Sequence, residues 1–253
     1  MVITGQRSGY RRKRMLEAAG AAVSRLARPD GHGRGPLAAF GALAAADVAA
    51  VARNPRGPGR AGKPLLMPAL AGHVLRRRED ASEPVPKALV AGLAFAAAGD
   101  TALLFDHHES AFLVGMAAFL GTQVSYTAGY TRLGALRGIV RKPWPALACL
   151  GGWAAINALL APRLDEQLRL PVAGYSLALT IMGATALGVG GKVAAGAGSF
   201  LASDLLIGLQ AAGYELPSRQ AHEVLIMAGY LLGQYLITSG WLERTEAERA
   251  VTA

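Results

Sequence analysis

Three carboxyl groups interrupt long apolar stretches of this sequence. They are Asp47 in LAAADVAAV, Asp100 in AAAGDTALLF and Asp204 in FLASDLLIGL. Because an ionised carboxylate is costly in hydrocarbon, acids in such stretches are candidates for a functional role. Burial favours the neutral form of a carboxyl group, and a second acid close by favours it further, so that two acids can share one proton. Such a pair supplies one proton donor and one carboxylate, as general acid–base chemistry or a proton relay needs.

Asp100 and Asp204 are the catalytic candidates. Each follows a small residue, Gly99 or Ser203, and small residues let helices approach closely and leave space for a ligand or water. A purely structural pair of buried acids is the alternative. Asp47 is a substrate-binding candidate, and its alternative is a structural role, either in a crevice near the lipid headgroups or in a pair with Arg53.

The apolar blocks that carry these acids are long enough to cross a membrane. Of the 253 residues, 52% are apolar and only 17% are charged, and a helix needs about 20 mostly apolar residues to span a bilayer. The sequence therefore predicts an all-α fold, a polytopic membrane protein with a bundle of about eight transmembrane helices. The second segment is short and contains two prolines and Lys63, so a re-entrant or tilted helix is the alternative there. The segments are residues 36–52, 61–75, 87–105, 110–130, 143–162, 171–190, 194–212 and 221–241.

Basic residues give the expected orientation. The formal net charge is +9, and the run RRKR at residues 11–14 precedes the first span. Because basic residues favour the cytoplasmic side, the N-terminus and the C-terminus are both expected in the cytoplasm, and the basic loop at residues 53–60 opposes this orientation. The charge is expected to anchor the chain to lipid headgroups and not to bind nucleic acid. The expected domains are a basic cytoplasmic N-terminal extension (1–35), with disorder or an interfacial helix around residues 15–26, an eight-helix transmembrane domain (36–241) and a short cytoplasmic tail (242–253).

Depth along the helices predicts that several polar side chains lie in one layer. With a rise of about 1.5 Å per residue, Asp100 lies roughly 20 Å and Asp204 roughly 15 Å along helices that rise from the cytoplasm. A polar cavity open to the outer leaflet follows from this layer. Interhelical hydrogen bonding, packing or snorkelling is the ordinary alternative for each polar residue in it. The substrate-binding candidates are Lys63, Asp47, Asn157, Tyr175, Gln123, Tyr126, Tyr230 and Gln234.

Metal and cofactor chemistry is not expected. The run from Asp106 to Glu109, with His107 and His108 between them, has the residue types of a metal site. It occupies a tight loop in which adjacent side chains diverge, so a solvated loop is the preferred interpretation. The sequence has no Walker loop, dinucleotide fingerprint, Ser-His-Asp arrangement or zinc spacing in a suitable context.

Five motifs, in their order and spacing, resemble those of the YhhN-type integral membrane proteins, which include the lysoplasmalogenases. The resemblance spans about 200 residues. It implies an eight-helix fold, hydrolysis of a vinyl ether lysolipid, and catalytic importance for Asp100 and Asp204 at the family's Gly-Asp and Ser-Asp positions. Lys63 matches the Lys-Pro position and Tyr175 matches a tyrosine near the sixth helix. One departure is Gln123, which stands where family members often have a histidine. The motifs are KPLLMP, GLAFAAAGDTALL, FLVGMAAFLGTQVSY, GAGSFLASDLLIGL and YLLGQYLITSG.

Vinyl ether chemistry suits a pair of acids. Protonation of the outer alkene carbon gives an oxocarbenium ion, which water attacks, and the hemiacetal collapses to an aldehyde and an alcohol. In this interpretation Asp100 and Asp204 form the pair, Asn157 or Tyr175 positions water, and Lys63 contacts the phosphate. The expected substrate is an alkenyl-glycerophosphocholine or -ethanolamine, cleaved to a fatty aldehyde and a glycerophospho-base. The expected partners are membrane lipids and this lysophospholipid, in a bacterial-type cell membrane.

Two other classes of function stay open. Buried acids also form proton relays, so a proton-coupled small-solute transporter is the main alternative. An intramembrane aspartyl protease is a further alternative, suggested by the Pro-Ala-Leu triplet at residues 68–70. The Gly-x-Gly-Asp motif of such proteases reads Ala-Ala-Gly-Asp at residues 97–100. The oligomeric state is not indicated by the sequence.

Overall fold

A computed structural model describes residues 34–54, 62–81, 84–105, 108–214, 216 and 218–252. These residues are helical apart from short connections, with no strand among them, which confirms the predicted all-α fold. Nearly all of the predicted N-terminal extension lies outside the described residues, including the RRKR run and the segment around residues 15–26. The same is true of most of the basic loop at residues 53–60, and of Asp106 and His107.

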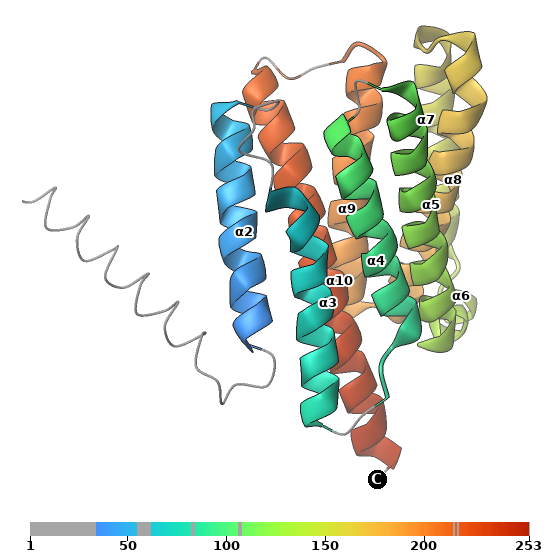
Figure 1. Ribbon diagram of the computed structural model, residues 1–253. Coiled ribbons are helices and arrows are strands. Elements are labelled where there is room, and N and C mark those ends of the chain that lie inside the picture. The colour runs from blue at the N-terminus through green and yellow to red at the C-terminus, as the bar shows by residue number, and fades with distance from the viewer. Residues whose placement is uncertain are drawn as a thin grey trace, which may run out of the picture.

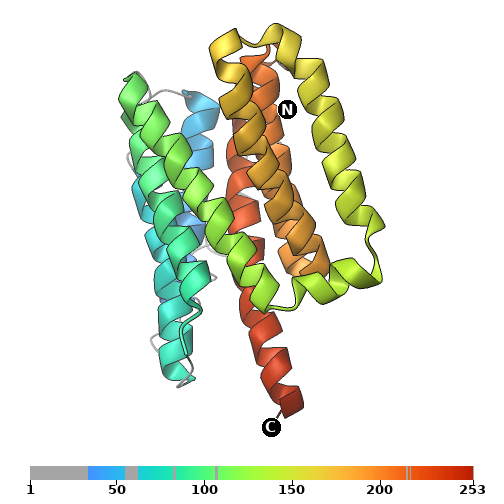
Figure 2. The ribbon, with the colours of Figure 1, turned by 90° about the vertical axis from the view of Figure 1, so that its right-hand side faces the viewer.

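Eight long helices of the described chain alternate in direction (Figure 1). The short α6 (Ala135–Arg141) lies across one end of the bundle, called here the α6 end, and the start of α2 and the end of α10 lie at this same end (Figures 1 and 2). At the opposite end, the single-turn helices η2 (Leu103–Phe105) and η3 (Ala161–Arg163) follow α4 and α7. The long helices are α2 (Arg34–Arg53), α3 (Lys63–Asp80), α4 (Lys87–Ala102), α5 (Glu109–Arg132), α7 (Trp144–Leu160), α8 (Glu166–Val189), α9 (Gly191–Ala211) and α10 (Arg219–Thr252).

By their length and composition, seven of the described long helices are able to cross a membrane. They are all the long helices except α3, so the chain is a polytopic membrane protein with one fewer such helix than the eight predicted. The helix α3 does not qualify because its second half contains Arg76, Arg77, Arg78 and Glu79. It also begins below the neighbouring end of α2, as Figure 1 shows. A helix that starts inside the bundle places its first residue, Lys63, among the other helices.

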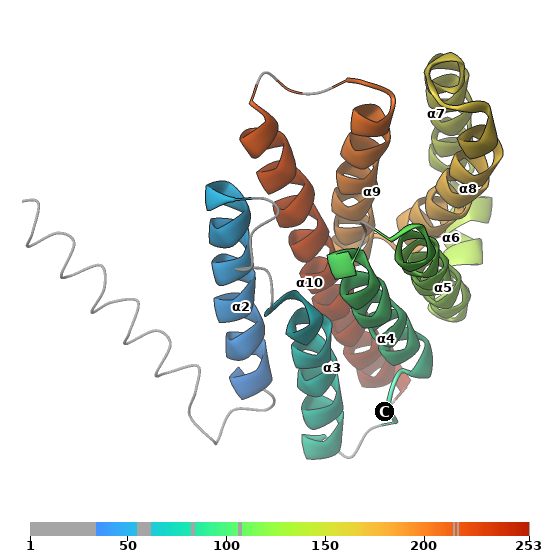
Figure 3. The same ribbon diagram turned by 45° about the horizontal axis from the view of Figure 1, so that its top comes forward.

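The helices form a layered bundle. Figure 3 shows α2 and α3 on one side, α7 and α8 on the other, and α4, α5, α9 and α10 between them. The inner face of α3 is fully buried at Leu66, Met67, Leu70 and Val74, and α3 packs against α2 and α4. These buried positions recur at helical spacing, as expected for an apolar face turned to a core.

The most extensive helix contact is between α9 and α10. A Cβ atom added at Gly196 would lie 2.6 Å from the backbone nitrogen of Ile237 and 2.8 Å from the carbonyl oxygen of Gly233. The backbones therefore touch, which is how membrane helices gain packing energy without a hydrophobic driving force. Two serine hydroxyls reinforce the contact: Ser199 donates to the carbonyl of Gly229 at 2.8 Å, and Ser203 donates to that of Ile226 at 2.7 Å.

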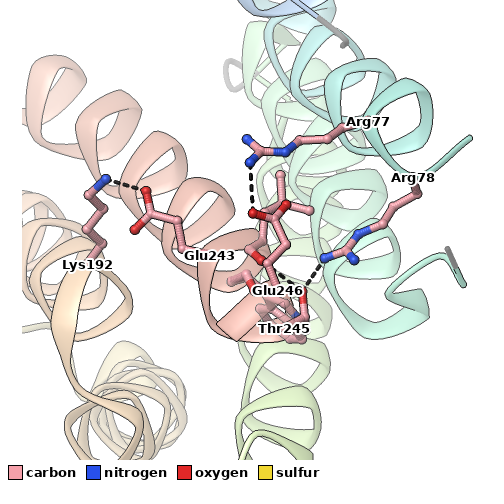
Figure 4. Close-up of polar contacts among 8 residues, drawn as sticks. Arg77, Arg78, Lys192, Glu243, Thr245 and Glu246 are labelled. Carbon is pink, nitrogen blue, oxygen red and sulfur yellow. Dashed lines mark hydrogen bonds and ion pairs between the residues drawn. The ribbon is translucent and has the colours of Figure 1, made fainter. Parts of the chain in front are cut away.

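Polar contacts hold α10 at the α6 end. Arg77 on α3 forms an ion pair with Glu246 at 2.9 Å, and Lys192 on α9 forms one with Glu243 (Figure 4). All four side chains are at least one third exposed, so each pair stabilises the fold by less than about 1 kcal/mol. These exposed pairs therefore contribute little to the stability of the protein.

The α9–α10 contact predicts a difference between two glycines of one helix. Gly196→Ala should lower the free energy of unfolding by about 1–3 kcal/mol, because the added methyl group meets backbone atoms of α10 that cannot move aside. Gly198→Ala is the matched control, since a Cβ atom there meets nothing within 4 Å. Thermal unfolding of the purified protein in detergent measures both. Equal melting temperatures for the two variants would contradict the close contact.

Candidate active site

A cavity of about 440 Å³ lies in the half of the bundle away from the α6 end. Six helices line it: α4, α5, α7, α8, α9 and α10, together with the first residue of α3. Its wall is mostly apolar with a few convergent polar groups, which is the usual form of a small-molecule site. The polar side chains of the wall are Lys63, Asp100, Trp153, Asn157, Tyr175, Ser176, Thr180, Ser203, Asp204 and Tyr230.

Asp100 is fully buried and is held by two other helices. The Lys63 ammonium group at the start of α3 lies 3.1 Å from its Oδ1 atom, and the Tyr230 hydroxyl on α10 donates to its Oδ2 atom at 2.8 Å. Both contacts favour the ionised carboxylate, because a cation and a hydrogen-bond donor stabilise its negative charge. Lys63 and Asp100 therefore form a buried ion pair in the cavity wall.

Two aromatic rings hold Tyr230 beside Asp100. Its ring packs edge-on against Phe119 at 5.8 Å and against Phe200 at 5.5 Å between ring centroids. Phe119 also explains Gly99, since a Cβ atom there would lie 2.7 Å from the Phe119 ring. The prediction that this small residue leaves space for a ligand or water was wrong, because the Phe119 ring fills the space.

Asp204 has a different partner. Its Oδ2 atom accepts a hydrogen bond of 2.8 Å from the Tyr175 hydroxyl on α8. Among the ion pairs found between described residues, none includes Asp204. Asp100 thus faces a cation and a hydroxyl group, whereas Asp204 faces a neutral hydroxyl group. Two acids in one cavity with unlike surroundings are suited to different roles in proton transfer.

A third polar group joins α7 to α8. The Asn157 amide donates to the Ser176 hydroxyl at 3.3 Å and to the carbonyl oxygen of Trp153 at 2.9 Å. The Trp153 indole N–H donates to the same Ser176 hydroxyl at 3.0 Å. Sequence reasoning missed Trp153 and Ser176. The sequence offered a signal for both residues. Trp153 precedes the candidate Asn157 by one helical turn, so the two share a helix face, and Ser176 directly follows the candidate Tyr175.

The structure separates the predicted site residues into two groups. Four of the candidates do not line the cavity, so the structure gives no reason to assign them a contact with a ligand there. Asp47 is buried on α2, which packs against α3 and α10. Gln123 is buried next to Tyr175, and Tyr126 donates to the Oε1 atom of Gln234 at 2.6 Å. The candidates brought together in the wall are Lys63, Asp100, Asn157, Tyr175, Asp204 and Tyr230.

Direct contact between the two acids stays a prediction. Both Asp100 and Asp204 line the cavity, and each has a hydrogen-bond partner of its own. Among the described residues, no group of three histidine, cysteine or acidic side chains lies close enough to hold a metal ion. The two carboxyl groups of the wall can transfer protons and stabilise positive charge.

Comparisons with known proteins identify relatives of the chain. The model of the YhhN family matches residues 60–241. The human protein lysoplasmalogenase TMEM86B is 33% identical over 154 residues, which is 59% of this chain and 61% of the human protein. The chain thus spans less than two thirds of the length of that relative. No solved structure matches the chain.

The buried ion pair makes a prediction about stability. Lys63→Met should lower the free energy of unfolding by about 3–5 kcal/mol, because it leaves the buried Asp100 carboxylate without its cation. The double variant with Asp100→Asn should recover most of the loss. Lys192→Met is the matched control, since it breaks an ion pair whose side chains are 50% exposed, and should change stability by less than about 1 kcal/mol. Thermal unfolding in detergent measures all three, and equal melting temperatures for the two single variants would refute the argument.

Proposed function

The chain belongs to the YhhN family, and on that premise we propose that it is a hydrolase of the lysoplasmalogenase type that cleaves the vinyl ether bond of a lysolipid. The observation that carries the proposal is one mostly apolar cavity that contains an ion-paired aspartate and a hydroxyl-bonded aspartate. This combination suits a substrate that has an apolar tail and a bond that is cleaved by acid catalysis. The name of the human relative, a lysoplasmalogenase, supports the same reaction.

The position of α7 supports access from the membrane. This helix packs mainly against α8 and stands apart from the rest of the bundle in Figure 2. Its inner face supplies Gly152, Trp153, Ile156 and Asn157 to the cavity, while its outer face is exposed at positions such as Leu147. In the proposed reaction the single alkenyl tail lies along this inner face, and the phosphate-bearing headgroup stays near the end of the bundle away from α6.

Asp204 is the proposed proton donor. Its hydroxyl partner Tyr175 and its place in an apolar wall are compatible with a neutral carboxylic acid. The acid transfers its proton to the outer alkene carbon, and the π electrons form the new C–H bond. The positive charge that results is shared by the inner carbon and the ether oxygen. Tyr175 then stabilises the Asp204 carboxylate by its hydrogen bond of 2.8 Å.

Asp100 is the proposed charge-stabilising group. Lys63 and Tyr230 keep it ionised, so it provides a fixed negative charge for the oxocarbenium ion. The Asp204 carboxylate removes a proton from water as the water oxygen attacks the inner carbon, which restores the neutral acid. The hemiacetal then loses its hydroxyl proton and its C–O bond to the glycerol breaks, while a proton reaches the leaving oxygen. One water is consumed, and the products are a fatty aldehyde and a free glycerol hydroxyl.

This assignment changes the role expected of Lys63. The sequence suggested contact with the substrate phosphate, whereas its ammonium group lies 3.1 Å from Asp100. A lysine that neutralises a buried carboxylate acts through that carboxylate. In the proposed mechanism Lys63 therefore positions Asp100 and maintains its charge, and contact with the phosphate is not required.

Mass spectrometry of lipids incubated with the purified protein tests the reaction. An alkenyl-lysophospholipid in mixed micelles should yield a long-chain aldehyde and the glycerophospho-base in equal amounts. Asp204→Asn should lower kcat by at least about 10²-fold, because it removes the proton donor. Asp165→Asn is the matched control, since Asp165 is an exposed acid just before α8. Aldehyde release that persists in the Asp204 variant would contradict the mechanism, and proton-coupled solute uptake without lipid cleavage would favour a transporter.

The path of the tail along α7 makes a second prediction. Gly152 lines the cavity, Gly151 does not, and a Cβ atom added at either glycine meets nothing within 4 Å. Gly152→Phe should raise KM about tenfold, which corresponds to the exclusion of about two methylene groups at about 0.8 kcal/mol each. Gly151→Phe is the matched control and should leave KM unchanged. Equal effects of the two substitutions on steady-state kinetics would exclude the inner face of α7 as the tail site.

A further inference from the structure

A second pocket, of about 250 Å³, lies at the α6 end, far along the helices from the catalytic candidates. It lies between the ends of α3, α5 and α10 and the start of α4. Its described lining has four basic side chains and no acidic side chain. Such a concentration of positive charge around one hollow favours a negatively charged ligand. The basic residues are Arg78, Lys87, Arg132 and Arg249.

Arg78 forms the buried inner wall of this second pocket, which is called the basic pocket below. It is only 1% exposed, and its guanidinium group donates to the Thr245 hydroxyl on α10 (Figure 4). The neighbouring Arg77 forms the ion pair with Glu246, so this carboxylate is turned toward Arg77 and does not line the pocket. A buried guanidinium group is costly unless its charge is compensated, and the Thr245 hydroxyl and the nearby Glu246 carboxylate contribute to that compensation. Arg78 still adds positive potential to the inner wall of the pocket.

The start of α4 adds a second feature that favours an anion. Pro86, Lys87 and Ala88 line the pocket, and α4 begins at Lys87 with no side chain capping its N-terminus. The first backbone N–H groups of a helix have no partner within the helix, and the helix dipole makes this end positive. Uncapped helix N-termini bind phosphate groups for this reason. Here the N-terminus and the four basic side chains converge on the same pocket.

Apolar residues complete the pocket and point to a lipid. Val85, Leu133 and Trp241 line it together with the basic residues. It lies at the ends of α5 and α10 and the start of α4, and all three helices are long and apolar enough to span a membrane. Basic pockets between such helices bind the headgroups of anionic lipids. We propose that the basic pocket binds the phosphate group of an anionic membrane lipid, at a site separate from the cavity that contains Asp100 and Asp204.

Lipid binding to the purified full-length protein tests the site without any measurement of turnover. Native mass spectrometry in a neutral detergent should show tighter binding of phosphatidylglycerol than of phosphatidylcholine. The double variant Lys87→Gln and Arg132→Gln should weaken phosphatidylglycerol binding about 30-fold, since each cation contributes about 1 kcal/mol and 1.4 kcal/mol is tenfold. Both side chains are exposed, so the fold should tolerate their loss, which thermal unfolding checks.

A second double variant serves as the control, because it also loses two positive charges at the α6 end. Arg137→Gln with Arg141→Gln removes two exposed cations from α6 that do not line the pocket, and should leave the affinity unchanged. An equal loss of affinity in both double variants, or equal binding of the two lipids, would overturn the proposal. Excess inorganic phosphate distinguishes the source of the phosphate group. Displacement of the lipid would assign the site to free phosphate as well, and retention of the lipid would assign it to the lipid alone.

Discussion

A buried carboxylate must have its charge compensated, and the ion pair between Lys63 and Asp100 meets this constraint. The constraint fixes several features of the fold. Lys63 is the first residue of α3, so α3 has to begin inside the bundle for its ammonium group to reach α4. Tyr230 on α10 binds the other carboxylate oxygen, and its ring is held in turn by Phe119 and Phe200. The helices α3, α4, α5, α9 and α10 are thereby positioned around one charged group.

The sequence predicted the helices and the height of the polar residues, but not which helices are neighbours. Span length and the cost of a buried acid depend on the chain alone, so the segments and the aspartates could be identified without a structure. The heights predicted for Asp100, Asp204 and Lys63 along their helices agree with the presence of all three residues in one cavity wall. The same argument placed Asp47 with them, yet α2 lies on the far side of the bundle from α7 and α8 (Figure 3), because height carries no information on direction around the bundle axis.

The unpredicted features depend on contacts between residues distant in the sequence. The space beside Gly99 is filled by Phe119 from the next helix, and the backbone at Gly196 touches that of Gly233. Such contacts are set by the shapes of two surfaces, and neither shape can be derived from one segment alone. The helix α10 takes part in the second of these contacts and also packs against α2 and α3. It supplies Tyr230 to the catalytic candidates and Trp241 to the basic pocket, so one continuous helix connects the two ends of the molecule.

Because α7 lies at the periphery, the shape of the cavity depends on residues that contribute little to the core of the bundle. Its inner residues shape the cavity, but the helix packs mainly against α8 and contributes little to the central core. Substitutions on this face at Gly152 or Ile156 alter the room for a ligand and leave the hydrogen bonds of Trp153 and Asn157 to α8 in place. The volume and outline of the cavity can therefore change through α7 alone, while the ion pair between Lys63 and Asp100 keeps its contacts.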